Sequence, residues 1–252
     1  MLKISEDLKM HIPNGLLDPK VSAGTAFAAA AVLGYCFARV RQALTHLVPE
    51  SVLAGAGQMA ANISEGSKRM MSTFAENHIM KMGAVASLIF AAQMLNFPVA
   101  AGTSGHLLGG ILAAIALGPF SGTIVISVVL LVQSIFFADG GITALGANIL
   151  NMAIIGTLFS YYIYYMVNNI FKGRSGFTMG ILIASFFSVL LAAIACSFEI
   201  ALSGTSPLSI VLPAMAAVHS RIGIAEGLIT IIAIEILKAR KFELDGKVIN
   251  ET

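Results

Sequence analysis

Residues 10–15 read Met-His-Ile-Pro-Asn-Gly, and a histidine in the second position of a chain is a natural metal chelator. If Met10 carries a free amine, that amine and the His11 amide nitrogen close a five-membered ring on a metal ion. The same amide nitrogen and Nδ1 of the imidazole close a six-membered ring. The amide must lose its proton, which favours metals that accept planar nitrogen sets, namely Ni²⁺, Cu²⁺ and Co²⁺. One position of the plane stays open for a second imidazole.

His106 is a candidate for that fourth position, at the end of the run Gly-Thr-Ser-Gly-His. The glycines beside it allow a loop backbone to pack closely. In the alternative interpretation, His106 binds no metal and instead caps the following helix or hydrogen-bonds a carbonyl, with Thr103 and Ser104 as candidate N-cap residues. The residue types leave both interpretations open.

The composition of the chain that carries these residues is typical of a membrane protein. Of the 252 residues, 57% are hydrophobic and 11% are charged, with a mean hydropathy of +0.87, whereas soluble domains are about 25% charged. The apolar runs are long and continuous, so they predict an all-α polytopic membrane protein. The net charge of +2 gives no argument for a nucleic-acid partner. Cys36 and Cys196 lie inside apolar runs, and we interpret them as core thiols.

Seven apolar segments are candidate membrane spans. They are about 22–38, 82–97, 106–117, 121–138, 144–170, 177–198 and 207–237. The last of them contains Pro213, so we expect it to be broken before about residue 218.

The positive charges orient these spans. With the N-terminus outside, eleven of the fifteen Lys and Arg residues fall on the inner side, as the positive-inside rule requires. We therefore predict a multi-pass protein of the plasma membrane, surrounded by lipid, with its C-terminus inside. Its predicted parts are an N-terminal segment, 1–21, inserted as a plug, a transmembrane domain, 22–238, and a cytoplasmic tail, 239–252. The inner loop, 42–80, is interpreted as either a surface helix or a disordered loop.

Several polar side chains near the outer ends of the spans are candidates to support the metal ligands. We expect some of them to bond His106 or the plug and fix the imidazole tautomer, with hydrogen bonding between helices as the alternative. They are Gln93, Asn96, Ser104, Asp139, Asn148 and Asn151. His219 and Glu226, inside the last span, are interpreted as nearer the inner half and suited to internal ion pairing or partner contact.

Several long motifs between residues 10 and 237 resemble the CbiM/NikM family. They are MHIPNG, FAAQMLNFPV, GTSGHLLGG, FADGGITALGANILNM and PAMAAVHSRIGIAEGLIT. The resemblance implies a seven-helix substrate-capture component of an energy-coupling factor transporter, with Co²⁺ or Ni²⁺ as the transported substrate and no tightly bound cofactor. It implies metal ligands at Met10, His11 and His106, and a role in supplying cobalamin biosynthesis.

The resemblance also implies partners: a transmembrane coupling subunit, ATPase subunits and a small accessory membrane subunit of the CbiN/NikN type. The chain itself has no P-loop motif. Two features depart from the family pattern, because nine residues precede Met10 and Ala100-Ala101 replace the usual Pro-Gly. We expect the functional chain to begin at Met10. The alternatives are an ion-coupled secondary transporter working alone, and an integral membrane metalloenzyme with His106 and His219 as ligands.

Overall fold

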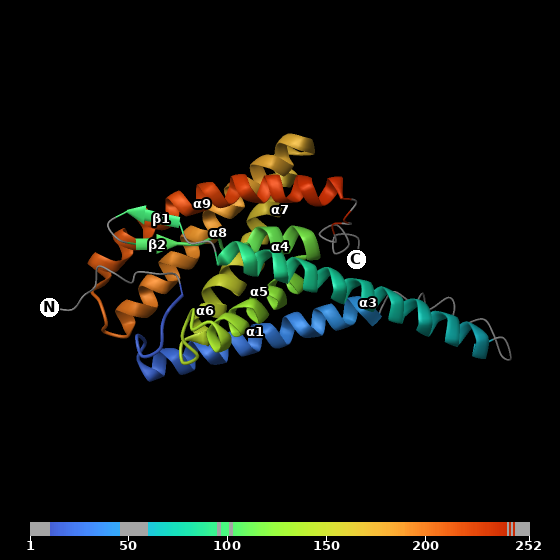
Figure 1. The fold of residues 1–252 in the computed structure, drawn as a ribbon, viewed down its shortest axis with the longest axis horizontal. Coiled ribbons are helices and arrows are strands. Elements are labelled where there is room, and N and C mark those ends of the chain that lie inside the picture. Colours follow the sequence, from blue (N-terminus) through green and yellow to red (C-terminus); the bar gives the residue numbers. More distant parts are fainter. Residues whose placement is uncertain are drawn as a thin grey trace.

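The structure is a computed structural model that describes residues 11–45, 60–94, 97–100, 103–240, 242 and 244. The described chain is almost entirely helical, which agrees with the predicted fold class. The elements are α1 (Pro19–Thr45), α3 (Ala60–Gln93), β1 (Phe97–Ala100), β2 (Thr103–Gly105), α4 (Gly110–Leu117), α5 (Pro119–Phe136), α6 (Leu145–Asn148), the π-helix η1 (Ile149–Phe159), α7 (Ser160–Phe171), α8 (Gly173–Leu202) and α9 (Leu208–Ala239). The starts of α1 and α9, the hairpin and α6 lie at one end of the bundle (Figure 1).

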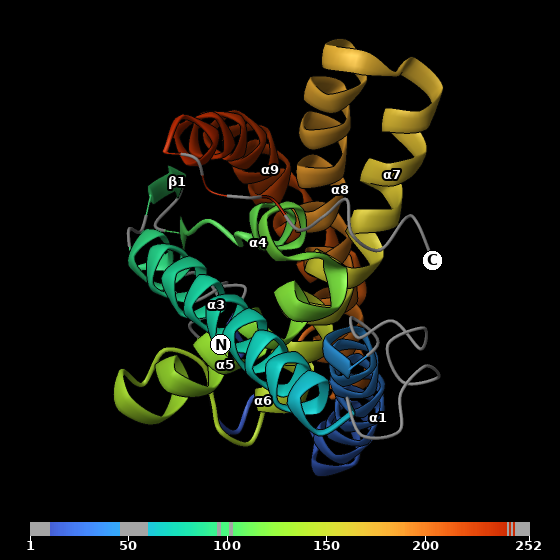
Figure 2. The same ribbon diagram turned by 90° about the vertical axis from the view of Figure 1, so that its right-hand side faces the viewer.

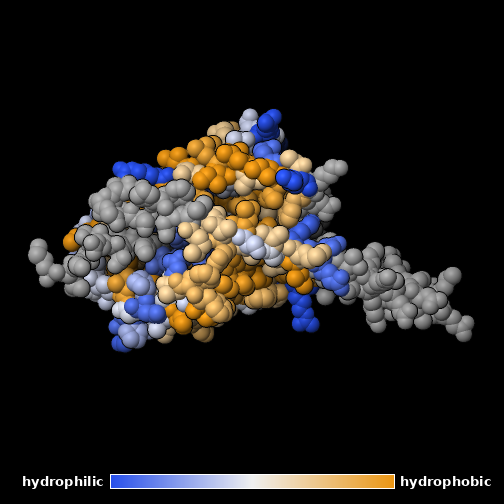
Figure 3. Space-filling model, in the orientation of Figure 1, coloured by the Kyte–Doolittle hydropathy of each residue, from blue (hydrophilic) through white to orange (hydrophobic). Residues whose placement is uncertain are grey.

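The helices carry the apolar surface that a membrane requires. Among the described residues, four helical segments are long and apolar enough to cross a bilayer: Pro19–Leu44, Pro119–Phe136, Leu145–Phe171 and Gly173–Leu202. Large apolar side chains such as Phe27, Ile170 and Leu202 are exposed, and Figure 3 shows apolar residues over the middle of one face, with hydrophilic ones toward its edges. The chain is therefore a membrane protein, and the count of seven spans stays a prediction.

The short helix α4 lies at the centre of the fold, where all eight of its residues are buried. Its neighbours approach so closely that only glycine fits at the contacts: a Cβ at Gly110 would lie 2.2 Å from the Gly156 carbonyl oxygen of η1. A Cβ at Gly122 of α5 would lie 2.9 Å from the Ala113 carbonyl carbon. Figure 2 shows α4 enclosed by the longer helices. The loop that carries His106 precedes α4 directly, so it is also drawn into the interior.

The expected break in the last span is absent, because α9 is continuous from Leu208 to Ala239 with Pro213 inside it. Proline removes one backbone hydrogen bond, and its ring crowds the carbonyl four residues earlier. Pro213 lies in the second turn, where the carbonyl affected is that of Ser209, in the first turn. The lost hydrogen bond therefore lies at the N-terminal end of the helix, and the helix continues past Pro213.

Much of the expected inner loop, 42–80, is helical. Residues up to Thr45 continue α1, and residues from Ala60 begin α3, because alanine, methionine, glutamate and lysine in this stretch favour helix. His78 therefore lies on a helix, where its Nε2 is 2.9 Å from Oγ of Ser121 on α5. Of the two interpretations of 42–80, the described part of this segment agrees with a helix.

Two short strands are an addition that the sequence did not predict. β1 and β2 form an antiparallel hairpin in which Phe97 is paired with Gly105. The hairpin leads from α3 to His106, so it fixes where the histidine loop enters the bundle.

Candidate metal site

The segment that follows Met10 is held inside the bundle as an extended strand-like insert. Ile12 is fully buried. Its N–H donates to Oδ1 of Asn148 at 2.8 Å, and its carbonyl accepts from Nδ2 of the same amide at 3.2 Å. The Ile12 carbonyl also accepts from the Gly141 N–H, at 2.8 Å, so the backbone of Ile12 makes three hydrogen bonds. Because Pro13 has no N–H and keeps Ile12 extended, the segment enters as a plug, although Met10 itself lies outside the described residues.

The plug also depends on the absence of a side chain at Gly141. A Cβ there would lie 2.3 Å from the Asn14 backbone nitrogen, which no native contact tolerates. Immediately beyond, Oδ1 of Asn14 accepts from both the backbone N–H and the hydroxyl of Thr143, at 2.9 and 3.0 Å. The Asp-Gly-Gly turn at 139–141 thus forms one wall of the plug.

The structure brings His11 and His106 together. Their ring centroids are 4.5 Å apart, and the ring planes are inclined at 59°. Both side chains are buried. Imidazole nitrogens are ligands that divalent transition metals accept, so this pair is the candidate metal site.

The hydrogen bonds of His106 define its tautomer. Its Nδ1 lies 2.8 Å from the Leu107 carbonyl oxygen, and a carbonyl can only accept, so Nδ1 carries the proton. The lone pair is then on Nε2, which is buried and has no hydrogen-bond partner among the described residues. The carbonyl bond that the non-metal interpretation expects is therefore present, and it leaves the second nitrogen available for a metal, as second-shell bonds to metal-binding histidines do.

Asp139 lies beside the other imidazole. Its Oδ1 is 3.0 Å from Nδ1 of His11. Within the described part of the chain, however, neither ring nitrogen of His11 has a hydrogen-bond partner. The carboxylate adds negative charge next to two unsatisfied nitrogens, so the site electrostatically favours a cation.

The loop 106–109 is fixed by side chains from three helices. Nε2 of Gln93 donates to the Leu108 carbonyl at 2.7 Å, and Gln133 donates to Oε1 of Gln93 at 2.9 Å. From α9, Glu226 accepts the N–H groups of Leu108 at 2.6 Å and of Gly109 at 3.2 Å. The N–H groups of Leu108 and Gly109 and the Leu108 carbonyl are therefore satisfied without any regular secondary structure.

Glu226 makes a contact that sequence reasoning did not predict. The expectation is internal ion pairing or partner contact, whereas in the structure its carboxylate accepts from N–H groups of the histidine loop. Its depth in the membrane stays a prediction. The available signal was an ionisable residue inside an apolar span, which is a functional candidate by default.

The other predicted supporting residues divide between the two interpretations. Asn148 holds the plug and Gln93 holds the histidine loop, whereas Asn151 donates to Glu199 of α8 at 2.7 Å and so joins helices. Ser104 lies in β2, and the N-cap of α4 is instead Gly109, with φ of 75°, so the N-cap interpretation is wrong. Asn96 lies outside the described residues.

No group of three His, Cys, Asp or Glu side chains converges within the described part of the chain in a way that could hold a metal. His219 is buried on α9, where its Nδ1 bonds the Met215 carbonyl at 2.8 Å. A complete coordination sphere around His11 and His106 therefore needs donors other than these side chains.

The fold and this site define a helical protein with apolar helices long enough to span a membrane, in which two buried imidazoles meet. Residues 45–244 match the family CbiM, described as the cobalt uptake substrate-specific transmembrane region. The chain therefore belongs to the CbiM family.

Individual relatives agree with this assignment. The chain is 38% identical over 223 residues to a putative fused nickel transport protein NikMN of Archaeoglobus fulgidus. The match covers 88% of this chain and 63% of that protein. It is 32% identical over 173 residues to a cobalt transport protein CbiM of Thermosipho melanesiensis, covering 66% of this chain and 72% of that protein. Among solved structures, a transition metal transporter superposes with a TM-score of 0.71 at 26% identity, covering 92% of this chain and 94% of the other.

Proposed function

We propose that the chain is the metal-capture subunit of an energy-coupling factor importer, and that it takes Co²⁺ or Ni²⁺ from outside the cell. The observation that carries the proposal is the contact of His11 with His106, in which Nε2 of His106 is buried and free to bind. The names of the relatives, a nickel transport protein and a cobalt transport protein, supply the two candidate metals.

The proposed coordination uses four nitrogens. The Met10 amine, the His11 amide nitrogen and Nδ1 of His11 form two fused chelate rings, and Nε2 of His106 occupies the fourth position. The bonds that Asn148 makes to Ile12 hold the chelating end of the plug in place. A bound dication would displace the amide proton to bulk water, and the Asp139 carboxylate would offset part of the remaining positive charge.

The proposed topology has seven spans, an outer N-terminus and an inner C-terminus in the plasma membrane. In this scheme residues 1–21 form the capture segment, residues 22–238 the transmembrane domain and residues 239–252 the cytoplasmic tail. The coupling subunit, the ATPases and an accessory subunit of the CbiN/NikN type are separate chains. The chain spans 63% of the length of the fused NikMN relative, so its whole-complex activity and any role in cobalamin synthesis belong to this proposal.

Reconstitution into proteoliposomes tests the proposal against the secondary-transporter alternative. The purified chain should bind Ni²⁺ or Co²⁺ in detergent, and vesicles that contain it alone should accumulate neither metal. Uptake should appear when the coupling subunit and ATPases are added with ATP. Uptake by the chain alone, driven by a proton or Na⁺ gradient, would contradict the proposal.

The N-terminal amine is tested with two chains that begin at Met1 and at Met10. The chain that begins at Met10 should bind Ni²⁺ more tightly, because an amide nitrogen in place of the amine is a much poorer donor. Equal affinities would show that the amine is not a ligand.

A further inference from the structure

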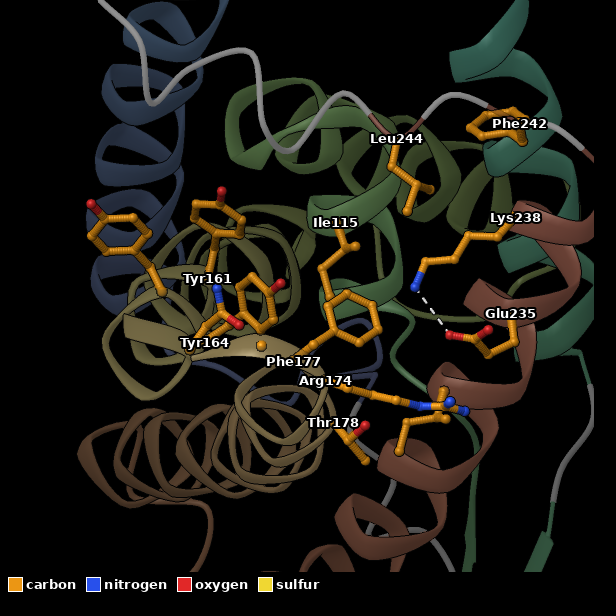
Figure 4. Close-up of a pocket in the computed structure, with 14 residues that line it drawn as sticks. Ile115, Tyr161, Tyr164, Arg174, Phe177, Thr178, Glu235, Lys238, Phe242 and Leu244 are labelled. Atoms are coloured by element: carbon orange, nitrogen blue, oxygen red, sulfur yellow. Dashed lines mark hydrogen bonds and ion pairs between the residues drawn. The ribbon is translucent and has the colours of Figure 1, made fainter. Parts of the chain in front are cut away.

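A second cavity lies away from the metal site, where α7 and α9 end and α8 begins. Its volume is about 850 Å³, within the range of about 300–1,000 Å³ that is typical of ligand pockets. α7 and α9 pack on α8 from two sides (Figure 2), and the cavity occupies the space between them. Ile115 of α4, together with Phe242 and Leu244 beyond α9, contributes to its lining (Figure 4).

Two cations face this cavity. Arg174, in the first turn of α8, has no ion-pair or hydrogen-bond partner within the described part of the chain. Lys238 of α9 is held 3.0 Å from Glu235 and 3.9 Å from the ring centroid of Phe177. Because Glu235 is the one carboxylate in the described lining, the ionised lining carries a net charge of +1, from two cations and one anion.

The start of α8 adds to this positive end. No side chain caps its first turn, and the turn contains no acidic residue. Uncapped N–H groups at a helix N-terminus favour an anion. Arg174, Lys238 and these N–H groups therefore give this part of the cavity a positive potential that suits an anionic group.

The remaining walls are apolar and aromatic. Tyr161, Tyr164, Phe177 and Ile115 line the cavity (Figure 4), together with Ile231 of α9. A free phosphate would leave these apolar walls uncovered, whereas an acyl chain would cover them. Tyrosines are also typical of the level at which a bilayer meets water.

From this combination we infer that the cavity binds one anionic phospholipid of the inner leaflet. The phosphate group lies against Arg174, Lys238 and the start of α8, and an acyl chain lies along the aromatic and aliphatic walls. Basic pockets between helices on the cytoplasmic side are suited to lipid head groups. The inference rests on the proposed membrane orientation, which places this end of the bundle inside.

Native mass spectrometry of the purified chain with added phosphatidylglycerol or phosphatidylcholine tests this site. One phosphatidylglycerol should be retained per chain, in preference to phosphatidylcholine. The double variant Arg174→Gln/Lys238→Gln should weaken phosphatidylglycerol binding about tenfold or more. The matched double variant Arg41→Gln/Arg240→Gln removes two exposed cations that do not line the cavity, and it should retain the parental affinity.

Several outcomes would overturn the inference. Equal retention of the two lipids would show that the head-group charge is not recognised, and an equal loss in both double variants would show a non-specific charge effect. Displacement by glycerol 3-phosphate would assign the site to a free phosphate. Unchanged lipid binding in Arg174→Gln/Lys238→Gln, with loss of coupling-subunit binding, would assign the surface to a protein. Ni²⁺ affinity measured on the same samples separates a failure of this inference from a failure of the proposed function.

Discussion

Replacement of Glu226 by alanine should loosen the histidine loop without touching a metal ligand. In the native chain the two carboxylate oxygens accept the N–H groups of Leu108 and Gly109, at 2.6 and 3.2 Å, in a fully buried setting. A buried donor left without a partner costs about 1–3 kcal/mol, so two such donors predict a loss of about 2–6 kcal/mol in the free energy of unfolding. Ni²⁺ affinity should fall about 10- to 100-fold, as for other losses of second-shell support.

The assay is thermal unfolding in detergent together with calorimetric titration of Ni²⁺. Glu235→Ala is the matched control, because it removes a carboxylate of the same helix that is 54% exposed and paired with Lys238. Such a pair contributes about 0–1 kcal/mol, and the control should bind Ni²⁺ normally. Glu226→Gln keeps one acceptor oxygen and should be intermediate, which provides a folded variant if alanine is too disruptive. Parental stability and affinity in Glu226→Ala would refute the reasoning.

Three further predictions concern the plug and the ligands. Gly141→Ala should displace the plug and abolish Ni²⁺ binding, because the new Cβ would lie 2.3 Å from the Asn14 nitrogen. In the control Gly34→Ala the new Cβ meets no atom within 4 Å, so this variant should bind Ni²⁺ normally. Equal Ni²⁺ affinities of the two variants would contradict this prediction. Asn148→Ala removes both bonds to Ile12 and should weaken Ni²⁺ binding about 10- to 100-fold, measured by the same titration. Binding should also weaken as the pH falls, because the metal must displace the protons of the amine and of the His11 amide; affinity independent of pH between 5 and 8 would exclude a deprotonated amide ligand.

The helical character of the chain and the meeting of two distant histidine segments were accessible from the sequence. Long apolar runs predict helices because backbone groups must be satisfied within each segment in lipid. His11 and His106 were assigned to the same side from charge alone, and the structure places their rings 4.5 Å apart. Their role as metal ligands stays a prediction.

Other features depended on packing between segments that the sequence does not reveal. The depth reached by the histidine loop follows from the burial of α4, so the bond from Glu226 to Leu108 could not be read from span boundaries. The continuity of α9 through Pro213 likewise depends on where the helix starts, because proline is least disruptive near a helix N-terminus. Asn148 and Asn151 are the same residue type, three positions apart in one predicted span. In the structure, however, Asn148 holds the plug and Asn151 joins two helices.

The most direct test of the account is the X-ray absorption spectrum of the Ni²⁺-loaded chain that begins at Met10. The account predicts a four-coordinate, planar site with nitrogen ligands alone and scattering from two imidazoles. In His106→Ala the spectrum should lose one imidazole and the affinity should fall, whereas His219→Ala should leave the nickel spectrum unchanged. A six-coordinate oxygen-rich site, or an unaltered spectrum in His106→Ala, would contradict the claim that the plug and the histidine loop capture the metal together.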